Sequence, residues 1–178
     1  MESPKTMNYI VRESYTLKHL LPYHWEEYKS IRLTALKTNP EMFGSSYAKE
    51  STYTRNDWTS LLENELRGMF AMYHEKSLVG LSGVAIRKET PTTAIFFASF
   101  IEPAHRGKGL SRLFYEARME WVHKKQCSLI TVSHRSGNTT SEAAIKRIGF
   151  KYTHTEEVNW PDGIRADELT YVLELNKS

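Results

Sequence analysis

The stretch "IEPAHRGKGLSRLF", residues 101–114, joins a very apolar segment to an amphipathic one. The preceding residues 92–101, "TTAIFFASFI", are almost continuously apolar, which is typical of a central strand covered on both faces. After the glycines, apolar residues recur at helical intervals of three and four: Leu110, Leu113, Phe114, Ala117 and Trp121. The stretch therefore predicts a strand, a glycine-rich loop and a helix in immediate succession.

The loop of this junction predicts a binding site for a polyanion. A helix begins with four N–H groups that have no partner within the helix, at the end that carries a partial positive charge. Gly107 and Gly109 allow a ligand to approach the backbone, and Arg106 and Lys108 add formal charge. We expect a phosphate or diphosphate at this position.

Two other phosphate-binding motifs fit these residues less well. A P-loop needs Ser or Thr after the lysine, but Gly109 follows Lys108, and no glycine stands five residues before Gly107. The dinucleotide fingerprint would need a third glycine where Arg112 stands. From these residues alone, the alternative that the glycines only turn the chain and the cations are only solvated stays open.

The rest of the chain predicts a mixed α/β sheet in one layered domain, residues 15–178, after an N-terminal leader, residues 1–14. About seven strands and about four helices are expected. The other strands are expected at 15–20, 69–73, 78–86, 128–133, 152–158 and 166–175. The other helices are expected at 22–40, 54–66 and 141–150.

Composition excludes several classes of protein. The net charge of +3, from 24 cations and 21 anions, argues against a nucleic-acid partner. Cys127 is the only cysteine, so no intramolecular disulfide is expected, and no metal site is expected either. No apolar run is long enough to span a membrane and no signal core is visible, so we expect a cytoplasmic protein with no membrane partner.

Several segments together resemble the GNAT superfamily of N-acetyltransferases. "RGKGLS", residues 106–111, is similar to the R/Q-x-x-G-x-G/A signature of that family. "NTTSEAAIKRIGF" (138–150), "LVGLSGVAI" (78–86) and "IRLTALKTNPEMFGSSYAKE" (31–50) resemble other regions of the family in the right order. The resemblance covers about residues 15–175. It implies a mostly antiparallel sheet that is splayed between its fourth and fifth strands, residues 92–101 and 128–133.

The resemblance implies an enzyme that transfers an acetyl group from acetyl-CoA to a primary amine by direct attack in a ternary complex. The amine would be carried by a small molecule or a peptide. The pantetheine arm would pair with the backbone of Phe100 and Ile101, with Asn138 and Ser141 on its other side. The residues implied to bind the diphosphate are Arg106, Gly107, Lys108, Gly109, Leu110, Ser111 and Arg112.

The sequence departs from the family pattern where acid–base chemistry is expected. Ser111 replaces Gly or Ala, and Ile145 stands where many members carry the tyrosine that protonates the leaving thiolate. For the general base our first candidate is His134 at the end of the fifth strand, and the second is Glu102. The alternatives are a solvated loop histidine and a carboxylate that pairs with Arg106.

The acceptor is expected between residues 43–53, "FGSSYAKESTY", and the turn at 159–167, "NWPDGIRAD". Trp160 in that turn would cap the pocket or mark a dimer contact, and a homodimer is the commonest soluble assembly. Because Ile145 cannot donate a proton, a catalytically silent domain that binds acyl-CoA is the alternative function.

Overall fold

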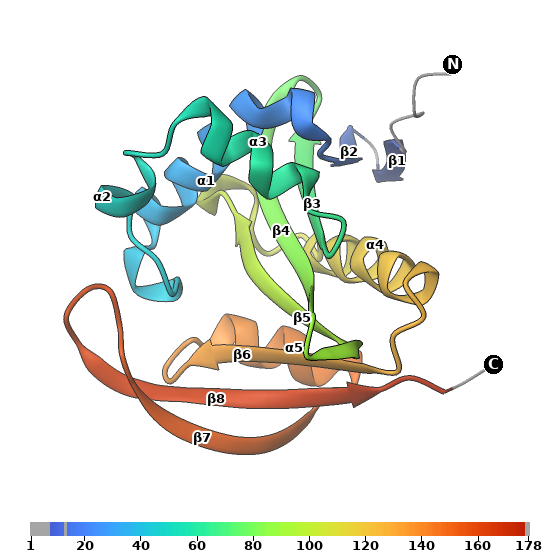
Figure 1. The fold of residues 1–178 in the computed structure, drawn as a ribbon, viewed down its shortest axis with the longest axis vertical. Helices are drawn as coiled ribbons and strands as arrows, with labels where there is room; N and C mark the ends of the chain where they lie inside the picture. The colour runs from blue at the N-terminus through green and yellow to red at the C-terminus, as the bar shows by residue number, and fades with distance from the viewer. Residues whose placement is uncertain (1–7, 13, 177–178) are drawn as a thin grey trace.

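The computed structural model describes residues 8–12 and 14–176, which form a mixed α/β domain around one sheet (Figure 1). Over the described residues the sheet has eight strands in the order β1-β2-β3-β4-β5-β6-β8-β7. The strands are β1 Asn8–Arg12, β2 Tyr15–His19, β3 Arg67–His74, β4 Ser77–Arg87, β5 Thr90–Ile101, β6 Leu129–Arg135, β7 Lys151–Asn159 and β8 Arg165–Glu174. The α-helices are α1 Trp25–Thr38, α2 Tyr47–Glu50, α3 Arg55–Glu63, α4 Ser111–Lys124 and α5 Thr139–Ile148. Three short 3-10 helices are η1 Pro22–His24, η2 Pro40–Met42 and η3 Pro103–His105.

The predicted fold class is confirmed, and the structure adds two elements to it. Asn8–Arg12, inside the segment expected to be a leader, forms strand β1 and pairs antiparallel with β2. Residues 1–7 and 13 of that segment lie outside the described residues. The second addition is α2, a single turn of four residues whose N-cap Ser46 accepts a hydrogen bond from Lys49 N–H. The four residues of α2 are too few for helical periodicity to show in the sequence.

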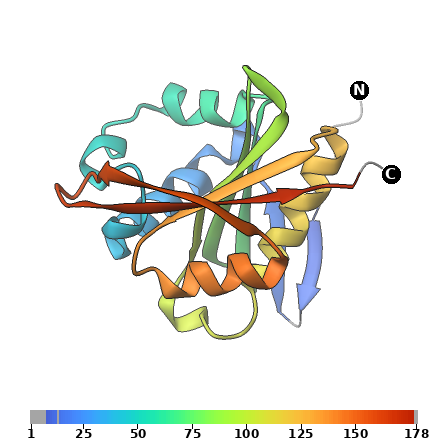
Figure 2. The same ribbon diagram turned by 90° about the horizontal axis from the view of Figure 1, so that it is seen from below.

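The helices cover the sheet on both faces (Figures 1 and 2). In β3, Met69 and Ala71 point into a core built with α1 and α3, whereas Phe70 and Met72 point into a second core built with α4 and α5. Successive side chains of a strand alternate between the two faces, so this strand is buried on both. The apolar stripe of α4 lies in the second core, as its spacing predicted.

The helix ends also follow the sequence signals. Thr54 forms a capping box with Asp57 at the start of α3, and Gly149 ends α5 with a left-handed φ of 107°. On the exposed face of α4, Arg112 and Glu116 form an i,i+4 ion pair at 2.7 Å. These local signals fix where the helices begin and end.

Strands β5 and β6 separate partway along their length. Every pair of neighbouring strands in this described sheet is antiparallel except β5 and β6, which α4 connects in parallel. Their pairing begins at Thr93 and ends at Phe96 opposite Val132, although β5 continues to Ile101. Just beyond, Ala98 adopts a φ of 56°, and the register between β4 and β5 shifts there. This bulge turns the end of β5 away from β6, so the expected splay is confirmed.

No helix in the described part of the chain is both long and apolar enough to cross a membrane.

At the edge of the sheet opposite β1, β7 and β8 form a long ribbon that extends past the helices (Figure 1). The side chains of β7 are exposed on both faces except at Val158, which is half-buried.

Candidate functional site

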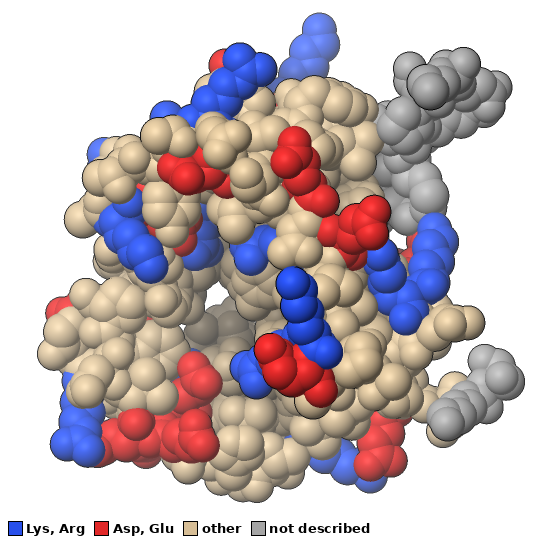
Figure 3. Space-filling model, in the orientation of Figure 1, with Lys and Arg blue, Asp and Glu red and all other residues tan. Residues whose placement is uncertain are grey.

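A cavity of about 520 Å³ lies where β5 and β6 separate. Its walls come from the end of β5, the glycine loop, the first two turns of α4 and one face of α5, with Met42 of η2 also lining it. The molecular surface is hollowed between the part that carries β5 and the part that carries β6 (Figure 3). Ser99 is exposed even though it lies within a long strand, because β6 no longer pairs with β5 here. The site is therefore a product of the splay.

The outer part of the cavity has the geometry of an anion site. Gly107 and Gly109 have φ values of 74° and 72°, which favour glycine, and a Cβ built at Gly107 meets no atom within 4 Å. Helix α4 starts at Ser111, and its N-cap residue Leu110 offers no side-chain acceptor. The first turn of α4 carries no acidic residue. An incoming anion can therefore take the place of the missing cap.

Most residues expected to bind the coenzyme line this one cavity. They are Phe100, Ile101, Arg106, Gly107, Gly109, Leu110, Ser111, Asn138 and Ser141. The other two do not line it. Lys108 points toward Tyr15, with its Nζ 3.4 Å from the hydroxyl, and Arg112 pairs with Glu116 on the exposed face of α4.

Two of the lining side chains also hold the backbone in place. Asn138 is the N-cap of α5, and its Oδ1 accepts a hydrogen bond of 3.1 Å from Ser141 N–H. Arg106 Nε donates to the carbonyl of Ile101 at 2.7 Å, and its Nη2 donates to Asn39 Oδ1 at 2.6 Å. Arg106 thus braces the glycine loop against β5 and η2, and in the described chain it has no ion pair with Glu102.

Neither candidate for the general base is among the described residues that line the cavity. His134 is buried on the face of β6 that also carries Ile130 and Val132, so it is not a solvated loop residue either. Its Nε2 lies 3.2 Å from the Tyr171 hydroxyl and its Nδ1 lies 2.8 Å from the Arg135 carbonyl. Glu102 is half-buried, and its backbone N–H donates to the carbonyl of Val79 at 2.8 Å.

The inner end of the cavity contains three residues that the sequence reasoning missed: Ser99, Tyr115 and Arg118. Arg118 is only 1% exposed. Its Nη1 donates to Ser99 Oγ at 3.2 Å, and burial lowers the pKa of Arg118 to about 10. A signal was present in the sequence, because Arg118 stands four residues after Phe114, on the apolar stripe of the helix.

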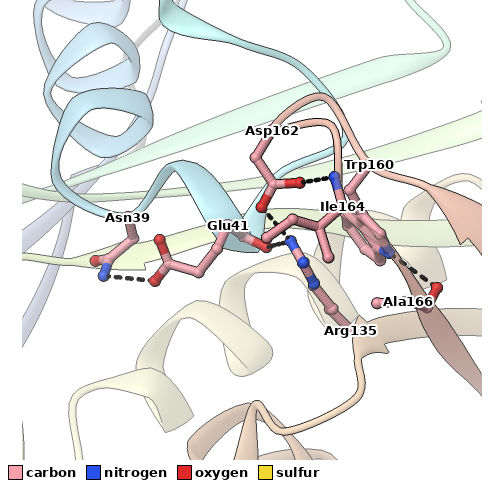
Figure 4. A network of polar contacts seen from close by, with 7 residues as sticks. All are labelled: Asn39, Glu41, Arg135, Trp160, Asp162, Ile164 and Ala166. Atoms are coloured by element: carbon pink, nitrogen blue, oxygen red, sulfur yellow. Dashed lines mark hydrogen bonds and ion pairs between the residues drawn. The ribbon is translucent and has the colours of Figure 1, made fainter.

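A second polar cluster joins the turn at 159–167, one of the two segments expected to surround the acceptor, to η2, which directly precedes the other segment, 43–53 (Figure 4). Arg135 Nη1 donates to Asp162 Oδ2 at 2.6 Å, in the turn between β7 and β8, and to the carbonyl of Glu41 in η2 at 3.2 Å. The Arg135 guanidinium also lies over the ring of Trp160, 5.2 Å from its centroid. The hydrogen bond from Arg135, with a further one from the N–H of Ile164, holds the pKa of Asp162 below its ordinary value.

Two residues of the segments expected to surround the acceptor, Trp160 and Glu50, are buried and hydrogen-bonded within the protein. Trp160 is buried, and its Nε1 donates to the carbonyl of Ala166 at 3.1 Å, so it is packed within its own turn. Glu50 is also buried and accepts two hydrogen bonds from Arg32, at 2.8 and 2.9 Å. Glu50 therefore anchors the segment after α1.

Comparison with known proteins identifies the family. A model of the acetyltransferase (GNAT) family matches residues 23–150, most of the chain. No curated protein matches the sequence.

Solved structures resemble the fold at low sequence identity. An acetyltransferase of the GNAT family from Streptococcus pneumoniae has a TM-score of 0.77 at 13% identity, covering 90% of this chain and 99% of that one. The ribosomal-protein-S5-alanine acetyltransferase from Vibrio fischeri has a TM-score of 0.78 at 13% identity, covering 94% and 96%. A putative acetyltransferase from Salmonella typhimurium, solved with its cofactor acetyl-CoA, has a TM-score of 0.77 at 15% identity, covering 93% and 96%. Since the family model spans well over half of the sequence, the chain belongs to the acetyltransferase (GNAT) family.

Proposed function

We propose that this protein transfers an acetyl group from acetyl-CoA to a primary amine, by direct attack of the amine in a ternary complex. The observation that carries the proposal is the cavity between the separated ends of β5 and β6, which reaches the uncapped start of α4. Family membership and a similar fold solved with acetyl-CoA support the same donor.

The residues around the cavity fit the chemical groups of coenzyme A. The main-chain N–H groups from Gly107 to Ser111 would bind the diphosphate, with the open space at Gly107 admitting it. The N–H of Arg106, which was also expected to bind it, donates to the carbonyl of Pro103 at 3.2 Å. The backbone of Phe100 and Ile101 has no partner strand on the β6 side, so it can pair with the amides of the pantetheine arm. Asn138 would complete the opposite wall, because its amide nitrogen remains a donor while its oxygen caps α5.

The chain's main contribution to the reaction would be positioning. An alkylamine with a pKa near 10 is mostly protonated at neutral pH, so one proton must leave before it attacks. No described side chain that lines the cavity is a carboxylate, and His105 is the one histidine among them. We therefore propose that solvent carries this proton. The thioester oxygen would accept a hydrogen bond from the backbone N–H groups of β5 beyond Ala98.

The acceptor would enter between η2 and the turn joining β7 and β8, which Arg135 holds together. The name of one similar structure refers to an alanine of ribosomal protein S5, and that of another, from Salmonella typhimurium, refers to the N-terminal serine of ribosomal protein L7/L12. Peptides that begin with alanine or serine therefore belong in the first acceptor panel, beside a polyamine, free amino acids and an amine drug.

A thiol-release assay with acetyl-CoA and this panel tests the proposal, with the acetylated product confirmed by mass spectrometry. We expect release of coenzyme A that depends on at least one amine. Tight binding of coenzyme A without turnover of any amine would instead favour the alternative, a catalytically silent acyl-CoA-binding domain. Absence of binding would contradict both functions.

A further inference from the structure

Arg118 is a buried cation at the inner end of the cavity. Among residues 8–12 and 14–176, no carboxylate forms an ion pair with it. Its guanidinium donates to the neutral oxygens of Phe114, Gly83 and Ser99, at distances of 3.2 to 3.4 Å. It is also hydrogen-bonded to the side chain of Tyr115, which is neutral as well. A buried charge is unfavourable unless an opposite charge compensates it. The environment of Arg118 therefore favours an anion in the adjacent cavity.

Tyr115 lies beside this cation and also lines the cavity. The guanidinium of Arg118 stands over its ring, 4.6 Å from the centroid, and the residue is 7% exposed. Burial raises the pKa of Tyr115, and the charge of Arg118 partly opposes this shift. The phenol is thus protonated at neutral pH, and the adjacent Arg118 guanidinium can stabilise the phenolate.

The two side chains lie where the reactive end of the coenzyme would be. Ser99, which accepts from Arg118, directly follows the bulge at Ala98 where β5 leaves β6. Seven residues separate Ser111 from Arg118, which is about 10 Å along the helix. A diphosphate at the start of α4 would therefore direct the pantetheine arm inward along β5, with its sulfur toward Ser99.

We propose that Arg118 and Tyr115 form the leaving-group site of the acetyl transfer, with Arg118 stabilising the sulfur anion and Tyr115 protonating it. As the new C–N bond forms and the C–S bond breaks, the bonding electron pair moves to sulfur, which takes the Tyr115 proton. The phenolate then takes the proton that the acylated nitrogen loses, directly or through water. This inference rests on the proposed function, since it requires coenzyme A in the cavity.

The alternative is that Arg118 only braces the bulge. Its bonds to Gly83 of β4 and Ser99 of β5 tie α4 to both strands, so its removal would destabilise the fold in either case. Stability alone therefore cannot decide between the two roles. The pKa of the bound coenzyme A thiol can distinguish them, because a purely structural Arg118 would not lie close enough to the sulfur to lower that pKa.

The first experiment titrates the thiol of coenzyme A bound to the full chain, through the ultraviolet absorbance of the thiolate. We expect at least about tenfold more thiolate, relative to thiol, than for free coenzyme A at the same pH, which corresponds to one pKa unit. R118K should retain most of the effect and R118M should abolish it. If binding is tight but the wild-type thiol titrates like free coenzyme A, the inference is wrong and the proposed function survives. If coenzyme A does not bind, both fail. The comparison of bound with free coenzyme A in the wild-type protein tests the inference even if R118M does not fold.

The second experiment tests Tyr115 with a selenium analogue of acetyl-CoA, because a selenolate leaves without needing a proton. With acetyl-CoA and the amine selected by the panel, Y115F should lower kcat about 100-fold and leave KM for the donor within about threefold. With the selenoester the loss should shrink to less than about threefold. Equal losses with both donors would show that Tyr115 has only a structural role.

Discussion

Arg135 Nη1, at the end of β6, lies 2.6 Å from Asp162 Oδ2, in the turn between β7 and β8. The same nitrogen donates to the carbonyl of Glu41 in η2, so one side chain joins two loops that lie far apart in the sequence. Both side chains of the pair are mostly buried, at 12% and 20% exposed. In the proposed function, the acceptor would enter beside this contact.

We predict that R135M raises KM for the amine about tenfold, because η2 and the turn lose their common partner. The affinity for coenzyme A, measured by calorimetry, should stay within about twofold, since Arg135 does not line the cavity. R165M is the matched control, because Arg165 forms an exposed ion pair with Glu157 on the same ribbon. An equal loss of coenzyme affinity in R135M would contradict the assignment of this contact to the acceptor side.

A second prediction concerns the buried pair of Arg32 and Glu50. E50Q should lower the free energy of unfolding by about 3 kcal/mol at pH 7, measured with urea, because it leaves the guanidinium without its counter-charge. E116Q removes an exposed ion pair with Arg112 and should change the free energy of unfolding by less than about 0.5 kcal/mol. Similar effects of the two substitutions would contradict the structural role of the buried pair.

The pH dependence of this pair follows from the pKa of Glu50. Burial alone would raise that pKa, but the hydrogen bonds and charge of Arg32 outweigh burial and hold it below the ordinary value of 4.5. A lowered pKa means that the folded state favours the carboxylate, so the stabilisation is fully present above pH 4.5 and is lost as the pH falls through the folded pKa. The difference in unfolding free energy between wild type and E50Q should therefore shrink below about pH 4. A difference that stays constant down to pH 3 would show that ionised Glu50 is not what stabilises the fold.

The sequence predicted the elements well because their signals are local. Thr54 and Gly149 mark helix ends through their own hydrogen bonds and backbone angles, and the stripe from Leu110 to Trp121 fixes the buried face of α4. The glycine loop was equally readable, since two positive φ angles require glycine there.

The inner end of the site could not be predicted in the same way. The splay depends on a bulge at Ala98. Its φ of 56° lies in the region that favours glycine, but the residue is alanine, so the sequence gives no signal of the bulge. His134 was proposed as the general base because it stands at the end of a strand. Its contacts, however, depend on which face of β6 its side chain lies on. Strand alternation puts it with Ile130 and Val132, on the buried face. Arg118 is different, because the sequence does place a cation on the apolar face of the helix, but we drew no conclusion from it.

The central claim is that the backbone at the start of α4 binds the diphosphate of coenzyme A. Calorimetry with coenzyme A on G107L tests it most directly, with G149L as control. Both glycines have positive φ and open space around Cβ, but only Gly107 lines the cavity. We expect G107L to weaken binding at least about 30-fold, roughly 2 kcal/mol, and G149L to bind like wild type. If G107L binds coenzyme A as tightly as wild type, the account is contradicted.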